Sequence, residues 1–208
     1  QESRGLGDVY KRQKLYSAMF KQAGIIQVDS AIELLDAAKA LALQPVPAGN
    51  RVAVLSQQAG AGLVLIDFCA MNGLTVPPFT DETKKKFEKL LPPYTIRTNP
   101  VDLAFAPLPW GRAEAAKLAL EDKNIDALIY FQLYFPMMGF PTEELVEFSK
   151  KYGKPIVAVL NGPQNTCKED AAKLEKGGIP VYPTPERGAK ALAYLAQYGQ
   201  ILKRFSKR

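Results

Sequence analysis

The 208-residue sequence contains no histidine and only two cysteines. Without an imidazole, the chain cannot hold a Ser-His or Cys-His nucleophile pair, a histidine metal ligand or a phosphohistidine. Cys69 and Cys167 have neither the spacing of a zinc site nor that of a disulfide framework. We therefore expect two inert thiols in a reduced cytoplasm, no catalytic residue and no metal site within this chain.

Long apolar runs are also missing, and the positive charge is unevenly placed. No stretch approaches the roughly 18 apolar residues of a membrane span, and no secretory signal pattern is present. The net charge is +6, but four of the positive residues fall in the last six positions. Residues 201–208 are therefore expected to form a basic, solvated tail, and the near-neutral remainder argues against nucleic-acid or membrane partners.

The first thirteen residues, QESRGLGDVYKRQ, differ in character from the rest. They are polar, have no regular hydrophobic period and show no helix-capping signal. They are similar to a translated sequencing-adapter peptide that recurs at the ends of metagenomic gene fragments. We expect residues 1–13 to be a non-native tail without a function, and the natural chain to have been cut there. The alternative is an ordinary disordered N-terminus.

Residues 14–43 are predicted to form a helix, a short strand and a second helix. Gly24 should end the first helix, residues 25–28 should be the strand, and residues 31–43 the second helix. Ser30 followed by Glu33 is a capping-box signature for that second helix. Residues 44–50 contain two prolines and a glycine, which is typical of a linker.

Residues 51–200 alternate between strand and helix patterns. The predicted strands are 51–56, 75–79, 126–132, 155–160 and 179–182, and the predicted helices are 63–72, 80–91, 112–121, 142–152, 168–176 and 185–198. This alternation predicts an α/β fold with a doubly wound, parallel, five-stranded sheet. A flavodoxin-like strand order of 2-1-3-4-5 would place ligands at the carboxyl ends of the strands.

The loop after the first strand is the best candidate for a phosphate site. Gly60, Ala61 and Gly62 are predicted to form a tight turn that leads into a helix. Backbone N–H groups and the helix dipole favour an anion at such a position. The alternative is a glycine turn that serves only packing.

Two other loops are predicted to line the same edge of the sheet. Asn99 and Asp102 belong to an Asn-Pro-Val-Asp turn, and Asn161 and Gly162 follow the fourth strand. Each could equally serve turn formation alone. An aromatic cluster comprising Tyr130, Phe131, Tyr134, Phe135 and Phe140 favours core packing, with the rim of a ligand site as the alternative, and Trp110 is similarly open.

The order of these segments resembles the ADP-forming acyl-CoA synthetases, relatives of succinyl-CoA synthetase. The likeness rests on YSAMFKQAGIIQVDSAIELLDAAKALA, NRVAVLSQQAGAGLVLIDF, NPVDL, GKPIVAVLNG and GGIPVYPTPERGAKALAYL, and it covers nearly all of residues 14–198. It implies that residues 14–43 end a first flavodoxin-like ligase domain and that residues 51–200 form a second CoA-ligase domain.

The resemblance also implies an activity, acyl-CoA + ADP + phosphate ⇌ acid + CoA + ATP, through a phosphohistidine. Gly60, Ala61 and Gly62 would form one of two phosphate-facing helix N-termini, although Gln57 and Gln58 depart from the family's usual small or Asn residues. Asn99, Asp102, Asn161 and Gly162 would line the site. The histidine would lie about ten residues before Tyr16, in the foreign-looking stretch.

The intact protein would use CoA, ADP or ATP, phosphate and Mg²⁺, and this chain alone would be inactive. Its missing partners would be a CoA-binding domain and an ATP-grasp domain or subunit, in a homo- or hetero-oligomer. One alternative is a synthetase-like regulatory region of a protein N-acetyltransferase, and another is a stand-alone flavodoxin-like interaction domain. The acyl substrate cannot be assigned from these residues.

Overall fold

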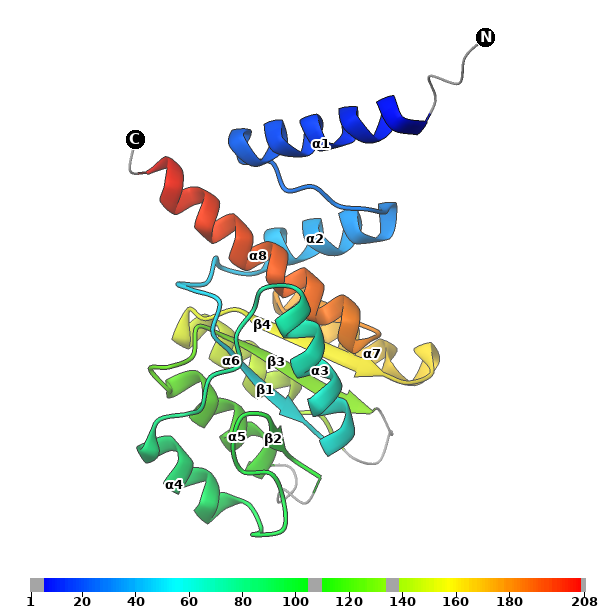
Figure 1. Ribbon diagram of the computed structural model, residues 1–208. Helices are drawn as coiled ribbons and strands as arrows, with labels where there is room; N and C mark the ends of the chain where they lie inside the picture. The colour runs from blue at the N-terminus through cyan, green and yellow to red at the C-terminus, as the bar shows by residue number, and fades with distance from the viewer. Residues whose placement is uncertain (1–5, 105–109, 134–138, 207–208) are drawn as a thin grey trace.

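A five-stranded parallel sheet forms the centre of the molecule (Figure 1). The computed structural model describes residues 6–104, 110–133 and 139–206. The sheet order is β2-β1-β3-β4-β5, with all neighbouring pairs parallel. The strands are β1 (Val52–Ser56), β2 (Val101–Asp102), β3 (Ala127–Leu133), β4 (Ile156–Asn161) and β5 (Val181–Tyr182). The predicted α/β class and the flavodoxin-like order are confirmed.

Helices cover both faces of the sheet, and each face has its own apolar core. One core joins Leu55, Leu128 and Ala158 of the sheet to α4 (Asp81–Leu90), α5 (Trp110–Glu121), α6 (Thr142–Tyr152) and α7 (Gln164–Lys176). The other joins Val54 and Ile129 to α3 (Ala59–Met71) and α8 (Pro185–Phe205). Burial on both faces explains why β1 and β3 are continuous apolar runs rather than alternating patterns.

The second strand of the sheet is not the one that the sequence predicts. Residues 75–79 were expected there, but only Thr75 forms an isolated bridge, with Arg51. The partner of β1 is instead β2, through Leu55–Val101 and Ser56–Asp102. Pro77 and Pro78 have no backbone N–H and cannot continue a hydrogen-bonded ladder. The prediction of this strand was therefore wrong, although the strand order was correct.

The N-terminal part consists of α1 (Leu6–Ala23) and α2 (Ala31–Leu43). Gly24 has a positive φ of 75° and ends α1 as expected. The predicted strand at 25–28 is wrong: the segment has no strand partner among the described residues, and Ile25 is half exposed. Residues 6–13, expected to be irregular, continue α1 at its start. Extending an existing helix costs far less than nucleating one, and nothing here is proline.

Polar contacts fasten α2 to α8 in the main body. Asp36 is buried and accepts two 2.7 Å hydrogen bonds from Arg187. Glu33 accepts a hydrogen bond from Lys190 Nζ at 2.6 Å and one from Tyr194 Oη at 2.9 Å. Its carboxylate therefore has a pKa below the ordinary value, chiefly through the hydrogen bond from Lys190. These bonds hold α2 along α8, as Figure 1 shows.

Residues 44–50 form no regular element, as predicted, but they are packed against the body. Gln44 is buried, its Oε1 accepts from Ile156 N at 2.8 Å, and its Nε2 donates to the Gly178 carbonyl. Lys203 Nζ donates to the Ala48 carbonyl. The segment is thus fixed at both ends.

Several helices also extend beyond their predicted ends. The last helix, α8, continues to Phe205, so the expected basic tail begins inside it. Cys167, which directly precedes the predicted helix at 168–176, lies within α7, because that helix begins four residues earlier than predicted. Across the part of the chain that the structure describes, no helix combines the length and apolar character needed to cross a bilayer.

Candidate functional site

The N-terminus of α3 lies at the carboxyl end of β1, where open α/β sheets bind ligands. Residues 59–62 were expected to be a tight turn, but they are the first turn of α3. Gln58 is the N-cap residue, and its side chain makes no capping hydrogen bond. The first N–H groups of a helix have no acceptor within the helix. A helix that begins at residue 59 therefore offers its first N–H groups to an anion.

The three residues predicted to bind phosphate do not play the same part. Gly60 is exposed, and a Cβ there would meet no atom within 4 Å. Gly60 and Ala61 are the second and third helical residues, whose N–H groups point out of the helix end. The N–H of Gly62, in contrast, donates to the Gln58 carbonyl at 3.1 Å. A Cβ at Gly62 would lie 3.3 Å from Ser56 Cβ and 3.4 Å from Pro100 Cβ, so Gly62 serves close packing.

Gln57 turns inward beneath this helix end. With its amide oriented to suit both neighbours, its Nε2 donates to the Leu133 carbonyl at 2.9 Å and its Oε1 accepts from Arg112 Nη2 at 3.0 Å. Its backbone N–H donates to the Phe131 carbonyl at 3.2 Å. The Gln57 side chain is therefore committed to the protein interior rather than to a ligand.

Arg112 was missed by the sequence reasoning, although it is only 1% exposed. Its Nη1 donates to the Gly139 carbonyl at 3.1 Å, and burial lowers the pKa of its guanidinium. Nearby, Gln132 is fully buried, and Tyr130 has a raised pKa because its hydroxyl is desolvated. The sequence does carry a signal for the burial of Arg112. This arginine stands among the small residues Gly111, Ala113 and Ala115, and such a pattern is typical of a helix side that packs inward.

Asn99 lies beside the first half of β1, not at its carboxyl end. Its Oδ1 accepts from Val54 N, and its Nδ2 donates to the carbonyls of Val52 and Pro77, each at 2.9 Å. All these partners are backbone groups that a neighbouring strand would otherwise satisfy. The arrangement favours the structural interpretation of Asn99.

Asp102 does reach the carboxyl edge of the sheet. It pairs in register with Ser56, two residues before the N-cap of α3. Its Oδ1 accepts from Ala104 N at 3.0 Å, which is local turn chemistry. The structure thus brings Asp102 and the start of α3 to the same place.

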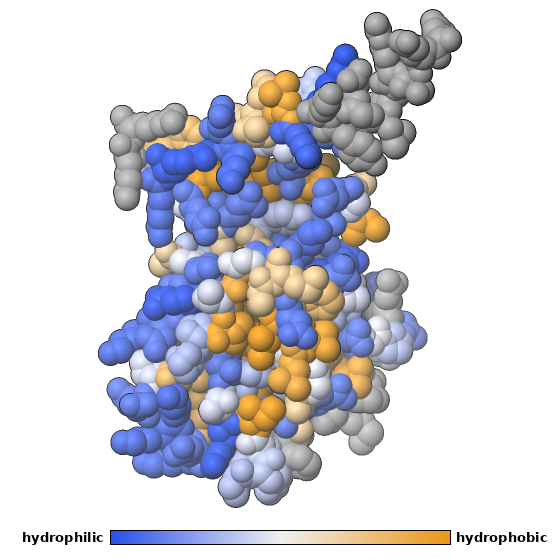
Figure 2. Space-filling model, in the orientation of Figure 1, coloured by the Kyte–Doolittle hydropathy of each residue, from blue (hydrophilic) through white to orange (hydrophobic). Residues whose placement is uncertain are grey.

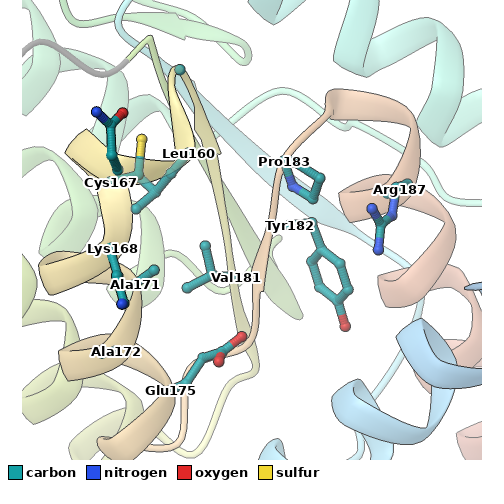
Figure 3. Close-up of a pocket in the computed structure, with 12 residues that line it drawn as sticks. Leu160, Cys167, Lys168, Ala171, Ala172, Glu175, Val181, Tyr182, Pro183 and Arg187 are labelled. Carbon is teal, nitrogen blue, oxygen red and sulfur yellow. The ribbon is translucent and has the colours of Figure 1, made fainter.

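Asn161 and Gly162 lie on the same edge but farther along it. β4 is two strand positions from β1, which corresponds to about 10 Å. Asn161 Nδ2 donates to the Pro183 carbonyl at 2.9 Å. Gly162 lies on the rim of a groove of about 760 Å³ between α7 and β5. Figure 3 shows Leu160 and Val181 on the sheet side of this groove and Lys168 on the α7 side.

The remaining predicted features are mainly structural. Burial raises the pKa of Cys69 to about 12 and also raises that of Cys167, so both thiols stay protonated. Tyr130 and Phe140 pack edge to face in the core at 5.0 Å, and Trp110 is exposed. Tyr134 and Phe135 lie outside the described residues. The described residues include no group of three or more acidic or cysteine side chains that could hold a metal ion.

Comparisons with known proteins place the chain in one family. The Ligase-CoA domain family matches residues 52–200. The chain is 34% identical over 191 residues to the alpha subunit of acetate–CoA ligase (ADP-forming) II from Pyrococcus furiosus, covering 88% of this chain and 41% of that subunit.

Solved structures show the same likeness. The apo dinucleotide-forming acetyl-coenzyme A synthetase 1 of Ca. Korarchaeum cryptofilum is 29% identical, with a TM-score of 0.82 over 93% of this chain and 43% of that one. The same enzyme in complex with phosphate and ADP gives a TM-score of 0.79 at 29% identity, over 93% and 42% of the two chains. The chain thus spans about two fifths of the length of these relatives. The resemblance to ADP-forming acyl-CoA synthetases is confirmed, and the match over residues 52–200 shows that this chain belongs to the Ligase-CoA domain family.

Proposed function

We propose that this chain is part of an ADP-forming acyl-CoA synthetase and supplies a helix N-terminus that faces phosphate. The complete reaction would be acyl-CoA + ADP + phosphate ⇌ acid + CoA + ATP, carried out in the cytoplasm. The observation that carries the proposal is the uncapped start of α3, with Gly60 and Ala61 open at the carboxyl edge of the sheet. A similar structure in complex with phosphate and ADP supports the choice of ligand.

The chemistry assigned to α3 is electrostatic. Two backbone N–H groups and the positive end of the helix dipole would hold a phosphate dianion and stabilise charge on its oxygens during transfer. Asp102 would line the edge of this site through its backbone, because its Oδ1 already accepts a hydrogen bond from Ala104 N. Gly162 would line the neighbouring groove, which lies outside the phosphate site itself, and Asn161 would stand beside it at the end of β4.

Other parts of the protein would supply the remaining chemistry. The chain has no histidine, so a phosphoryl-carrying histidine would come from another segment. CoA and the adenine nucleotide would be bound by a CoA-binding domain and an ATP-grasp domain or subunit. Mg²⁺ would be held together with the nucleotide phosphates.

Residues 14–43 would belong to the end of a first ligase domain. The outward side of α2 carries Ile32, Leu34 and Leu35, which are 58–69% exposed. Single exposed apolar residues are ordinary, but three on one short helix indicate a covered surface in the larger protein. Because the relatives named above are CoA ligases and synthetases, the regulatory region of an N-acetyltransferase is not favoured.

Phosphate titration of the chain followed by NMR tests the helix site. The amide signals of Gly60 and Ala61 should shift, whereas that of Gly62 should move less because its N–H is already bonded. Gly60→Asp should abolish the shifts, since a carboxylate repels the anion while remaining compatible with the first turn of a helix. Gly60→Ala is the matched control and should bind normally, because its Cβ enters open space.

A second assay tests whether this chain can form ATP without the other parts of the protein. The chain alone, mixed with acetyl-CoA, ADP, phosphate and Mg²⁺, should form no ATP. Appreciable ATP formation would show that the phosphoryl carrier is not needed and would overturn the proposed role. Absence of any phosphate-induced shift at Gly60 and Ala61 would remove the site itself.

A further inference from the structure

Arg112 stands at the meeting point of three segments around the proposed phosphate site. It comes from the first turns of α5 and reaches Gln57, which directly precedes the N-cap of α3. It also reaches Gly139, on the far side of the segment that follows β3. Through Gln57 it is linked to the Leu133 carbonyl, at the end of β3. One side chain thus connects the β1–α3 turn to both ends of the segment between residues 133 and 139.

The burial of Arg112 makes this connection energetically important. A guanidinium that is 1% exposed has lost its hydration, which is unfavourable unless hydrogen bonds compensate. The acceptors described for it are the Gln57 amide oxygen and the Gly139 carbonyl. The planar fork of arginine serves two acceptors from separate nitrogens in a fixed geometry, whereas the donors of a lysine all rotate about one nitrogen. Each bond to a charged donor is also stronger than a neutral one.

Gln57 connects Arg112 to the start of α3. Its backbone N–H is bonded to the Phe131 carbonyl and its side chain is held on both sides, so the residue cannot rotate independently. The next residue, Gln58, is the N-cap of α3 and accepts from Gly62 N. Gly60 and Ala61 lie inside that first turn. The direction of their N–H groups therefore depends on how Gln57 is held.

We propose that Arg112 is a positioning residue that fixes the first turn of α3, and with it the N–H groups of Gly60 and Ala61, through its contacts with Gln57 and Gly139. The role of these N–H groups toward phosphate rests on the proposed function. The fixing of the turn by Arg112 does not depend on it and can be measured separately.

Hydrogen exchange of the backbone amides tests the positioning role without any ligand. In Arg112→Gln the Gly62 amide should exchange about tenfold faster or more, as expected when a charge-assisted hydrogen bond is lost. Arg112→Lys keeps the charge but not the fork, and it should speed exchange to an intermediate extent. The Val157 amide, in the buried strand β4, reports global unfolding and should change less than the Gly62 amide in either variant.

Gln57→Leu provides a second, independent variant. It leaves the Arg112–Gly139 bond in place and breaks the link to α3 and Leu133. Gly62 should again exchange faster, and the double variant Gln57→Leu/Arg112→Gln should be no faster than the more severe single one, because both break one chain of contacts. Arg187→Gln is the matched control, since it removes a bonded arginine on another side of the fold and should leave Gly62 unchanged.

Phosphate titration of the same variants separates this inference from the proposed function. If Arg112→Gln speeds exchange of the Gly62 amide and weakens the phosphate shifts at Gly60 and Ala61, the positioning role and the proposed function both hold. If Gly62 loosens but the wild-type chain shows no phosphate shift, the positioning role holds and the proposed function fails. If exchange at Gly62 matches wild type, or changes only in step with Val157, the positioning role is overturned whatever phosphate does.

Discussion

The Asn99 side chain takes the place of a strand backbone beside β1. Its amide oxygen accepts one hydrogen bond and its amide nitrogen donates two, one donor more than a peptide unit could offer, and all three go to backbone groups. This is why β1 remains satisfied along its outer side although its strand partner, β2, is only two residues long. A polar residue predicted for a ligand site thus contributes to the sheet instead.

Asn99→Ala should lower the free energy of unfolding by about 2–4 kcal/mol, because three backbone groups lose their partners. Asn161→Ala loses one hydrogen bond to Pro183 and should cost about 1 kcal/mol or less. Urea unfolding followed by circular dichroism measures both variants. Equal losses for the two would contradict the assigned role of Asn99.

Glycines within the helices also differ in how much space surrounds them. A Cβ at Gly188 would overlap the Val159 side chain, where α8 meets β4, whereas one at Gly60 would meet nothing. We expect Gly188→Ala to lose about 1–3 kcal/mol through overpacking. Gly60→Ala should lose nothing, since alanine is the better helix former. Thermal unfolding measures the stability of both variants. A Gly188→Ala protein as stable as wild type would show that α8 can shift away from the sheet.

The helices were easier to predict than the strands, for a local reason. Ser30 and Glu33 mark the start of α2, and its predicted bounds are those observed. A strand, in contrast, is defined by a distant partner, so residues 25–28 and 75–79 have strand-like composition without a strand. The pairing of Arg112 with Gln57 depends on the same kind of distant contact. For this reason the candidate site was predicted at the start of α3, but its supporting residues were not.

The contact between α2 and α8 should depend on pH. The Glu33 carboxylate has a pKa lowered below its ordinary value of 4.5, first through the Lys190 hydrogen bond and then through that from Asp29 N. A lowered folded pKa means that this stability is present above about pH 4.5 and is lost as pH falls through the folded value.

Glu33→Gln should therefore be less stable than wild type at pH 6, by about 1 kcal/mol or less for a partly exposed pair. The difference should shrink as the pH falls from 6 through the lowered pKa of Glu33, because the wild-type carboxylate is then neutralised as well. Urea unfolding at a series of pH values gives the comparison. A difference that stays constant with pH would show that the ion pair contributes nothing.

Among the described residues, exposed apolar side chains gather on two parts of the molecule. One is α3, where Leu63, Val64 and Met71 are exposed; Figure 2 shows apolar residues gathered over the part of this face where α3 lies in Figure 1. The other is α1 and α2, where Leu15, Met19, Ile32 and Leu35 are all more than half exposed. Such surfaces promote association when their normal cover is absent.

We expect the chain to self-associate through α2 as its concentration rises. The double variant Ile32→Lys/Leu35→Lys should sediment as a smaller species than wild type at the same concentration. Ala38→Lys, which adds a charge to the same helix without removing a large apolar group, should behave like wild type. Analytical ultracentrifugation measures all three, and a wild-type chain that stays monomeric at high concentration would contradict the expectation.

The packed segment 44–50 has a mechanical consequence. Gln44 is bonded to Ile156 N and Gly178 O, and Ala48 O is bonded to Lys203. A hinge at this point would break these bonds and the Asp36–Arg187 pair together. These bonds therefore oppose bending between α2 and the sheet. If the proposed synthetase moves a phosphoryl group between distant sites, bending between these two parts would first have to break them.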